Sequence, residues 1–165
     1  MIKVYHGSYV KVDSPDLSFS RDALDFGRGF YVTPLYDQAV SWALRWKRHH
    51  RKAVVNTYCF HDELIPGMEL KIRKFPVYDR EWLRFVADNR DGRPVEEYDI
   101  VEGGIANDQV FNTLELYFSH LISEEQALDR LKSEKPNHQI CIRRQDLISR
   151  LLVFESAEEI DDGSR

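Results

Sequence analysis

The sequence predicts one α+β domain in which the first and last strands meet in space. Strand-like segments stand at both ends of the 165-residue chain, and stretches with apolar residues at helical spacing lie between them. A chain of this length can bury a sizeable core as one domain, and no internal repeat is visible. We expect the domain to cover residues 1–155 and residues 156–165 to form an acidic, flexible tail.

The composition is that of an ordinary globular protein, with 42% hydrophobic and 31% charged residues. The net charge of −5 argues against a surface built for nucleic acid, although residues 45–52 form a local basic run. Cys59 and Cys141 lie far apart without a zinc-type spacing, which favours a reducing compartment and predicts no metal site. With no long apolar run and no signal peptide, we expect a cytoplasmic protein that does not bind membranes.

Two strands and a helix are predicted in the first third of the chain. Residues 2–6 and 30–32 read as strands separated by a polar, turn-rich segment. Thr33 can cap the following helix, and Pro34 suits its first position. Trp42 and Trp46 recur at helical spacing on its apolar face, and we interpret both as core residues.

The remaining elements are predicted from periodicity, glycine breaks and one capping signal. Ser123 and Gln126 have the pattern of a capping box, which opens a helix through Lys132. The other predicted elements are strands at 53–60, 68–73, 139–142 and 151–154, helices at 81–89 and 108–121, and a helical turn at 145–150.

Two short phrases carry the chemistry: His6-Gly7-Ser8, and Gly27-Arg28-Gly29-Phe30-Tyr31. Glycine lets a ligand approach the backbone closely, and the His6 and Ser8 side chains can donate to ribose hydroxyls. A tyrosine ring at position 31 can stack on a flat heterocycle, and a cationic ring would gain about 0.5–2 kcal/mol there. Each phrase alone also fits a satisfied core histidine or a packed tyrosine. Together they predict a nucleotide-type ligand.

In this combination the phrases resemble the ADP-ribosyltransferase fold, in the branch with a His-Tyr-Glu triad that includes diphtheria toxin and the poly(ADP-ribose) polymerases. The resemblance implies a split β core of mostly antiparallel strands with inserted helices and NAD bound in the cleft. It also implies triad roles for His6 and Tyr31 and a backbone contact from Gly7 to the nicotinamide carboxamide. Ser41 falls near a serine that contacts the same amide, and Arg28 either reaches a cofactor phosphate or pairs with a surface carboxylate.

The third triad position departs from this pattern, because Gln139 occupies the slot of the catalytic glutamate. A neutral glutamine can hydrogen-bond the ribose but supplies no negative charge to an oxocarbenium-like centre. Asp108 is the best candidate for a helping carboxylate, with Asn107 beside it as a cofactor contact. Either of these two residues also fits the cap of the helix that follows.

More narrowly, the chain is similar from Tyr5 to about Leu152 to a bacterial family filed as domain of unknown function 3990. The phrases that carry this resemblance are Tyr98-Asp99-Ile100-Val101, Ala106-Asn107-Asp108, Leu121-Ile122-Ser123 and Gln139-Ile140-Cys141. The resemblance implies an ADP-ribosyltransferase-like protein encoded beside a small partner, as in a toxin–antitoxin pair.

The sequence therefore predicts an NAD-dependent ADP-ribosyltransferase that modifies a protein or nucleic acid and is restrained by a small antitoxin. Three alternatives stay open. The chain can be an NAD glycohydrolase, a pseudoenzyme that binds NAD or ADP-ribose without turnover, or a scaffold whose helical insert at 81–132 binds a partner.

Overall fold

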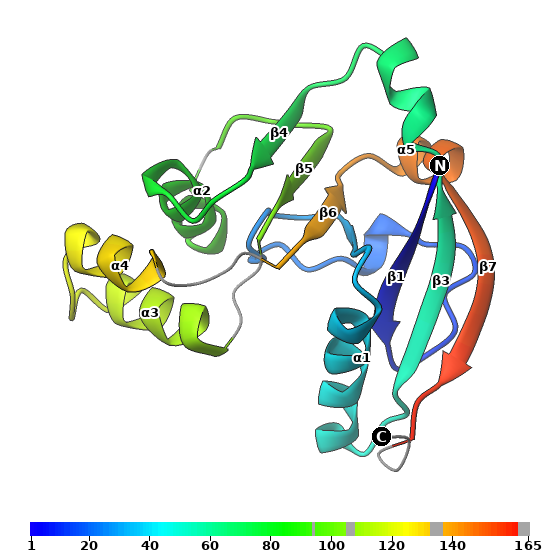
Figure 1. Ribbon diagram of the computed structural model, residues 1–165, viewed down its shortest axis with the longest axis horizontal. Coiled ribbons are helices and arrows are strands. Elements are labelled where there is room, and N and C mark those ends of the chain that lie inside the picture. The colour runs from blue at the N-terminus through cyan, green and yellow to red at the C-terminus, as the bar shows by residue number, and fades with distance from the viewer. Residues whose placement is uncertain (94, 105–107, 133–136, 162–165) are drawn as a thin grey trace.

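The computed structural model describes residues 1–93, 95–104, 108–132 and 137–161, which build two sheets (Figure 1). The first sheet is antiparallel, in the order β1-β3-β7, and the second has the order β2-β6-β5-β4, with β4 and β5 as its parallel pair. The strands are β1 (Ile2–Ser8), β2 (Phe30–Val32), β3 (Val54–Phe60), β4 (Ile72–Phe75), β5 (Ile100–Gly103), β6 (Gln139–Ile142) and β7 (Leu152–Glu159). An isolated bridge between Tyr5 and Thr33 joins β1 to the segment that follows β2.

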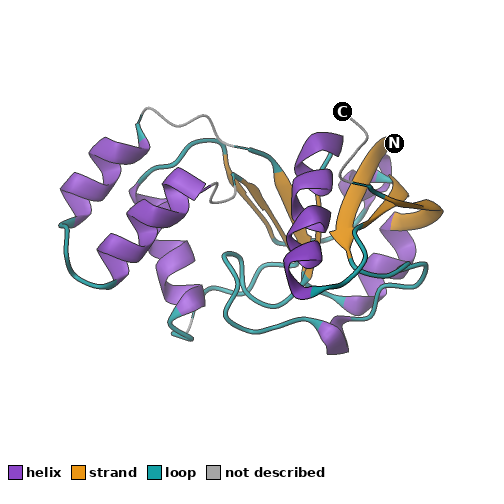
Figure 2. Cartoon of the chain, turned by 90° about the horizontal axis from the view of Figure 1, so that it is seen from below, coloured by secondary structure: helices purple, strands orange, loops and turns teal. Residues whose placement is uncertain are grey.

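The helices fall into two groups on either side of this junction. Helix α1 (Tyr36–Leu44) runs along β1 and continues as a 3-10 segment, Arg45–His49. Helices α2 (Arg80–Arg90), α3 (Asp108–Phe118) and α4 (Glu124–Leu131) gather beyond the second sheet, whereas α5 (Gln145–Leu151) leads into β7. Figure 2 shows the same division from below: some strands lie between the helices at the left and the central helix, and the others lie beyond that helix, near the N-terminus. None of the described helices is both long and apolar enough to cross a bilayer.

Three buried clusters hold these parts together. The first includes Val4, Val32 and Ile140 and therefore joins side chains from both sheets. The second lies among α2, α3, α4 and the second sheet, and its members include Phe26, Trp82, Leu83, Val101, Leu114 and Leu131. The third seals α1 against β3 through small side chains: Ala39, Ala43, Ala53 and Val55. Small residues in the third cluster allow α1 to lie close to the sheet.

Several elements match the sequence-based expectations. Strands β2 and β6 have the predicted bounds, and Ser123 and Gln126 form the reciprocal capping box. The predicted start of α1 is wrong, because Thr33 belongs to the bridge with Tyr5 and is held extended. Its Oγ1 accepts from the Leu35 N–H at 3.1 Å, and the helix begins at Tyr36.

The expected flexible tail is wrong for residues 156–159. Strand β7 continues to Glu159 and pairs with β3 from Leu152 to Glu159, with a register shift at Glu155, and the Ile160 N–H donates to the Ala53 carbonyl at 2.7 Å. Lys52 forms an ion pair with Glu159 at 2.7 Å, so basic neighbours balance the acidic edge. Acidic residues at a sheet edge therefore resemble a flexible tail in the sequence, although they form a strand in the structure.

Candidate functional site

The candidate site begins where β1 separates from β2. Tyr5 and Thr33 exchange two backbone hydrogen bonds, at 2.8 and 2.9 Å. In a continuing antiparallel ladder, Gly7 and Tyr31 would form the next such pair. Instead, the carbonyl of Tyr31 bonds Nδ1 of His6 at 2.8 Å. The imidazole takes the place of a backbone partner, and the ladder stops after one pair.

This opening leaves the backbone of Gly7 without a partner. Residues two apart in a strand direct their N–H and C=O groups to the same edge, so Gly7, like Tyr5, faces the β2 side. Among the described residues, neither group of Gly7 has a hydrogen-bond partner there. Gly7 is partly buried, so its donor and acceptor, which lie side by side, offer a place for a ligand or for water.

The absence of a side chain at Gly7 has a packing cause. A Cβ at this position would lie 2.3 Å from the carbonyl oxygen of Ala39 and 2.7 Å from the backbone nitrogen of Ala43. The backbone of α1 thus fills the space beside the glycine in which the sequence predicts a close ligand. The ligand-accessible part of Gly7 is its peptide edge, while α1 covers its α-carbon.

His6 presents an acceptor at the same opening. A carbonyl only accepts, so Nδ1 must carry the proton in the bond to Tyr31. Burial lowers the pKa of His6 below its ordinary value, against the opposing effect of that bond, and favours the neutral ring. Neutral His6 therefore offers the lone pair of Nε2. In this tautomer Nε2 can accept from a hydroxyl but cannot donate to one, which is the opposite of the direction expected from the sequence.

A cavity of about 600 Å³ extends from this opening. Its walls are β1, the segments around residues 9–14 and 16–24, the start of β2, and Trp46; His6, Ser8, Gly29, Phe30 and Tyr31 all line it. The rim is fixed by Asn56 of β3, which is fully buried. Its Oδ1 accepts from the Val12 N–H at 2.7 Å, and its Nδ2 donates to the Val10 carbonyl at 3.1 Å.

Tyr31 is held firmly on the far side of the opening. Its hydroxyl donates to the Gly27 carbonyl at 2.5 Å and accepts from the Phe26 N–H at 3.1 Å. Burial, with the Cys141 thiol and the Asp25 carboxylate nearby, raises the pKa of Tyr31 well above 10, so the phenol stays protonated. The ring stacks on Phe26 with centroids 6.5 Å apart, so its orientation is fixed before any ligand arrives.

The remaining cofactor candidates are divided between the cavity and other places. Ser8 and Phe30 are buried at the cavity wall, and the Phe30 ring lies 4.5 Å from that of His6. Gly29 is needed for packing, because a Cβ would lie 2.3 Å from the Cys141 sulfur. Ser41 is exposed and does not line the cavity; its hydroxyl donates to the Asp37 carbonyl at 2.9 Å.

Arg28 lies at a neighbouring cavity. Its guanidinium donates twice to the Leu17 carbonyl, at 3.2 and 3.0 Å, and it lines a second cavity of about 830 Å³. The two cavities share Asp16 and Leu17, so the turn that carries them separates Arg28 from His6. In this arrangement Arg28 stabilises the turn through its hydrogen bonds to the Leu17 carbonyl.

Gln139 opens β6 and is almost fully buried, at 3% exposure. Tyr31 pairs with Cys141, and Gln139 lies two residues before Cys141, so Tyr31 and Gln139 are on the same face of the second sheet. Its Nε2 has no partner in the part of the chain that the structure describes. A buried donor without an acceptor costs about 1–3 kcal/mol. Gln139 lines neither of these two cavities, so the structure does not bring it into the wall that His6 and Tyr31 share.

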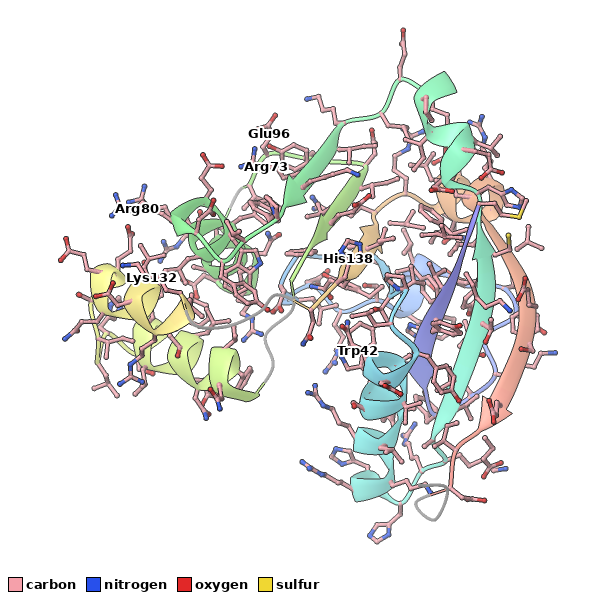
Figure 3. The ribbon with its side chains drawn as sticks, viewed as in Figure 1. Trp42, Arg73, Arg80, Glu96, Lys132 and His138 are labelled. Carbon is pink, nitrogen blue, oxygen red and sulfur yellow. The ribbon has the colours of Figure 1, made fainter. Side chains whose placement is uncertain are left out.

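Helix α1 supports the segment before Gln139. Gln38 donates from Nε2 to the His138 carbonyl at 3.0 Å, which ties α1 to the start of β6. Figure 3 shows Trp42 on α1 and His138 before β6, both in the middle of the molecule. Asp108 is the first residue of α3, but its side chain and the whole of Asn107 lie outside the described residues. The role of Asp108 therefore stays a prediction.

Sequence reasoning missed the outer end of the cavity. Trp42 and Trp46 are only partly buried and do not belong to the three buried clusters, so their interpretation as core residues is wrong. Trp46 lines the cavity together with Tyr9. The repeat of tryptophan at i and i+4 was the available signal, since such residues share one helix face.

A family model described as "Protein of unknown function (DUF3990)" matches residues 2–154, and the chain belongs to this family. The match includes β1, the cavity wall and β6, and ends within β7. No curated protein and no solved structure matches the chain significantly.

Proposed function

We propose that this protein is an NAD-dependent ADP-ribosyltransferase with an ADP-ribosyltransferase-like split β core, acting on a macromolecule. The observation that carries the proposal is the open edge of β1, where the peptide groups of Gly7 and Nε2 of His6 have no partner among the residues that the structure describes. Both residues border the split between the two sheets.

The chemistry of nicotinamide fits this edge. A primary carboxamide has an N–H donor and a C=O acceptor, which complement the C=O and N–H of Gly7. Two parallel hydrogen bonds of this kind fix the plane of the ring as well as its position. A ribose hydroxyl donates to Nε2 of His6, and Tyr31 provides a rigid aromatic wall.

The proposed reaction breaks the bond between nicotinamide and the ribose C1′. The bond electrons leave with nicotinamide, which becomes neutral, and the ribose acquires oxocarbenium character. A nucleophile of the acceptor attacks C1′ and loses its proton to solvent or to a nearby base. Gln139 holds a ribose hydroxyl through its unpaired Nε2, while any negative charge must come from elsewhere, with Asp108 as the candidate.

The setting of this activity follows from the sequence resemblance. We place the enzyme in the cytoplasm, where NAD is available, as the toxin of a toxin–antitoxin pair restrained by a small protein. Cys59 and Cys141 are both free thiols, which agrees with a reducing compartment.

The first experiment measures nicotinamide release from NAD and NAD binding by the purified protein. We expect His6→Ala to abolish nicotinamide release. Whichever of Gln139→Ala and Asp108→Ala lowers release more identifies the residue that acts at the third triad position. Ser41→Ala, an exposed control, should behave as the wild type. Release without an acceptor would define a glycohydrolase. Binding without release would favour the pseudoenzyme, which Gln139→Glu should then activate. Neither binding nor release would overturn the proposal.

A further inference from the structure

An aromatic and cationic cluster stands at the outer end of the cavity. Tyr9 follows β1, Trp46 lies in the 3-10 segment after α1, and their ring centroids are 4.7 Å apart. The Arg51 guanidinium lies 4.3 Å from the Tyr9 ring centroid and 5.9 Å from that of Trp46. Tyr9 and Trp46 both line the cavity that His6 lines at its other end.

The backbone places Arg51 at this position. His50 adopts a left-handed conformation, with φ of 56°, and ends the 3-10 segment. The chain then folds back, so that the Arg51 N–H donates to the Trp46 carbonyl at 3.2 Å. The side chain of Arg51 therefore lies over the ring of Trp46, the residue that the Arg51 backbone also contacts.

The charge of Arg51 is not neutralised by the protein. Lys47 and Lys52, its neighbours in the basic run, pair with Asp161 at 3.8 Å and Glu159 at 2.7 Å. Arg51 contacts aromatic faces and has no carboxylate partner among the described residues. Arg21 also lines the cavity, and it too lacks an ion pair in the described part of the chain.

Position along β1 relates this cluster to the proposed nicotinamide end. His6 and Tyr9 are three positions apart, which corresponds to roughly 10 Å of extended chain. Trp42 lies against Gly7, with its Cβ 2.8 Å from the position of a Gly7 Cβ, and Trp46 lies one helical turn farther on. The cavity therefore offers the proposed nicotinamide end and, farther out, the two rings and the Arg21 side chain, with the Arg51 guanidinium packed on the rings.

We infer that Tyr9, Trp46 and Arg51 bind the nucleoside diphosphate half of the dinucleotide. The base stacks on the aromatic pair, and Arg51 donates to the diphosphate oxygens, with Arg21 as a second cation. This inference rests on the proposed function and adds to it the site of the adenine nucleotide half. A nucleic-acid strand also uses aromatic stacking and arginine, but it needs a row of free cations. Lys47 and Lys52 are already paired with the carboxylates of Asp161 and Glu159, which favours a small diphosphate over a nucleic-acid strand.

The test compares three ligands by calorimetry: NAD, nicotinamide mononucleotide and ADP. In the variant Arg51→Gln, we expect binding of NAD and ADP to weaken about tenfold, since a charge-assisted hydrogen bond is lost. Trp46→Leu should weaken the same two ligands. Binding of nicotinamide mononucleotide, which lacks the second nucleotide, should stay within about twofold of the wild type in both variants. Arg48→Gln, an exposed neighbour in the basic run, serves as the matched control.

Each outcome separates this inference from the proposed function. If NAD binds and both variants bind NAD and ADP like the wild type, the inference is overturned while the proposed function stands. If ADP binding depends on Arg51 but NAD is neither bound at its nicotinamide end nor cleaved, the inference holds and the proposed function fails. If ADP does not bind and a single-stranded oligonucleotide binds through Arg51 and Trp46, the cluster is an acceptor surface and the inference is wrong.

Discussion

The two edges of β1 make opposite use of the same strand. Toward β3, all seven residues of β1 have register partners, from Ile2 with Phe60 to Ser8 with Val54. Toward β2, the contact is the single bridge of Tyr5 with Thr33. The backbone chemistry of the two edges is identical, so the difference must come from side chains and from neighbouring elements.

Two adjacent residues produce this difference. His6 bonds the carbonyl of Tyr31 and thereby removes the partner that Gly7 would have had. Gly7, in turn, lets the backbone of α1 lie directly against β1. An unpaired sheet edge ordinarily invites aggregation or a foreign strand. Here the opening is short and enclosed, which suits a small ligand with one donor and one acceptor.

The largest expected effect is that of Gly7→Ala, which changes the residue at the unpaired edge of β1. The new Cβ would lie 2.3 Å from the Ala39 carbonyl oxygen, a backbone atom that cannot move without shifting α1. We expect a loss of about 1–3 kcal/mol in the free energy of unfolding by urea, as for overpacked cores, together with loss of NAD binding.

Gly67→Ala is the control for this substitution, because no atom lies within 4 Å of the position that its new methyl group would take, and its φ is not positive. Equal stability of the two alanine variants would contradict the tight contact between α1 and β1.

The substitution Asn56→Ala tests the edge of β1 that pairs with β3. Asn56 stands opposite His6 in the β1–β3 ladder and holds the loop after β1 through Val10 and Val12. Its removal breaks two partly buried hydrogen bonds, each with a net value of about 0.5–1.5 kcal/mol, so we expect a loss of about 1–3 kcal/mol in urea unfolding. The loop that lines the cavity should also loosen, with faster amide hydrogen exchange at Val12. Asn112→Ala, at an exposed position on α3, should change neither quantity, and a similar loss there would mean that the Asn56 bonds do not hold the loop.

Local signals explain which parts of the fold the sequence predicts. β2, β6 and the Ser123–Gln126 capping box depend on a few consecutive residues, and all three are confirmed. Thr33 has the right composition for a helix cap, but its bridge to Tyr5, 28 positions earlier, determines its conformation. The acidic stretch after Glu155 likewise becomes a strand because β3 offers it an edge.

The candidate site shows the same limit. The His6-Gly7-Ser8 phrase identifies the opening, because its residues are adjacent in sequence. Asn56 could not be found, since its partners Val10 and Val12 are more than 40 positions away. The place of Trp46 could not be predicted either, because helical spacing shows that residues share a face but not what that face contacts.

A smaller effect is expected for Tyr31→Phe, which tests the far side of the opening. The change removes the hydroxyl bonded to Gly27 and Phe26 and keeps the ring. We expect about 1 kcal/mol of lost stability in urea unfolding, the usual net value of such bonds. Tyr36→Phe removes an exposed hydroxyl that bonds Glu158 at 3.2 Å and should cost less. Equal losses would mean that the Tyr31 hydroxyl does not anchor the loop before β2.

The smallest expected effect is a pH dependence that belongs to His6 alone. Burial lowers the pKa of His6 in the folded protein below the ordinary 6.5, so the unfolded chain takes up a proton first as the pH falls. Stability from this residue is therefore fully present above pH 6.5 and decreases below it, down to the lowered folded pKa. The variant His6→Asn can still donate to the Tyr31 carbonyl but cannot titrate.

Urea unfolding between about pH 8 and about pH 5 should therefore show a steeper loss for the wild type than for His6→Asn. The variant His49→Asn, at an exposed position, should keep the wild-type slope. NAD affinity of the wild type should fall only at lower pH, as the pH passes the lowered folded pKa of His6, because protonation then removes the lone pair of Nε2 that receives the ribose hydroxyl. An equal slope in wild type and His6→Asn would mean that the ring titrates freely in the folded state. The bond from the His6 imidazole to the Tyr31 carbonyl would then not hold the two strands apart, and the split between β1 and β2 would need another cause.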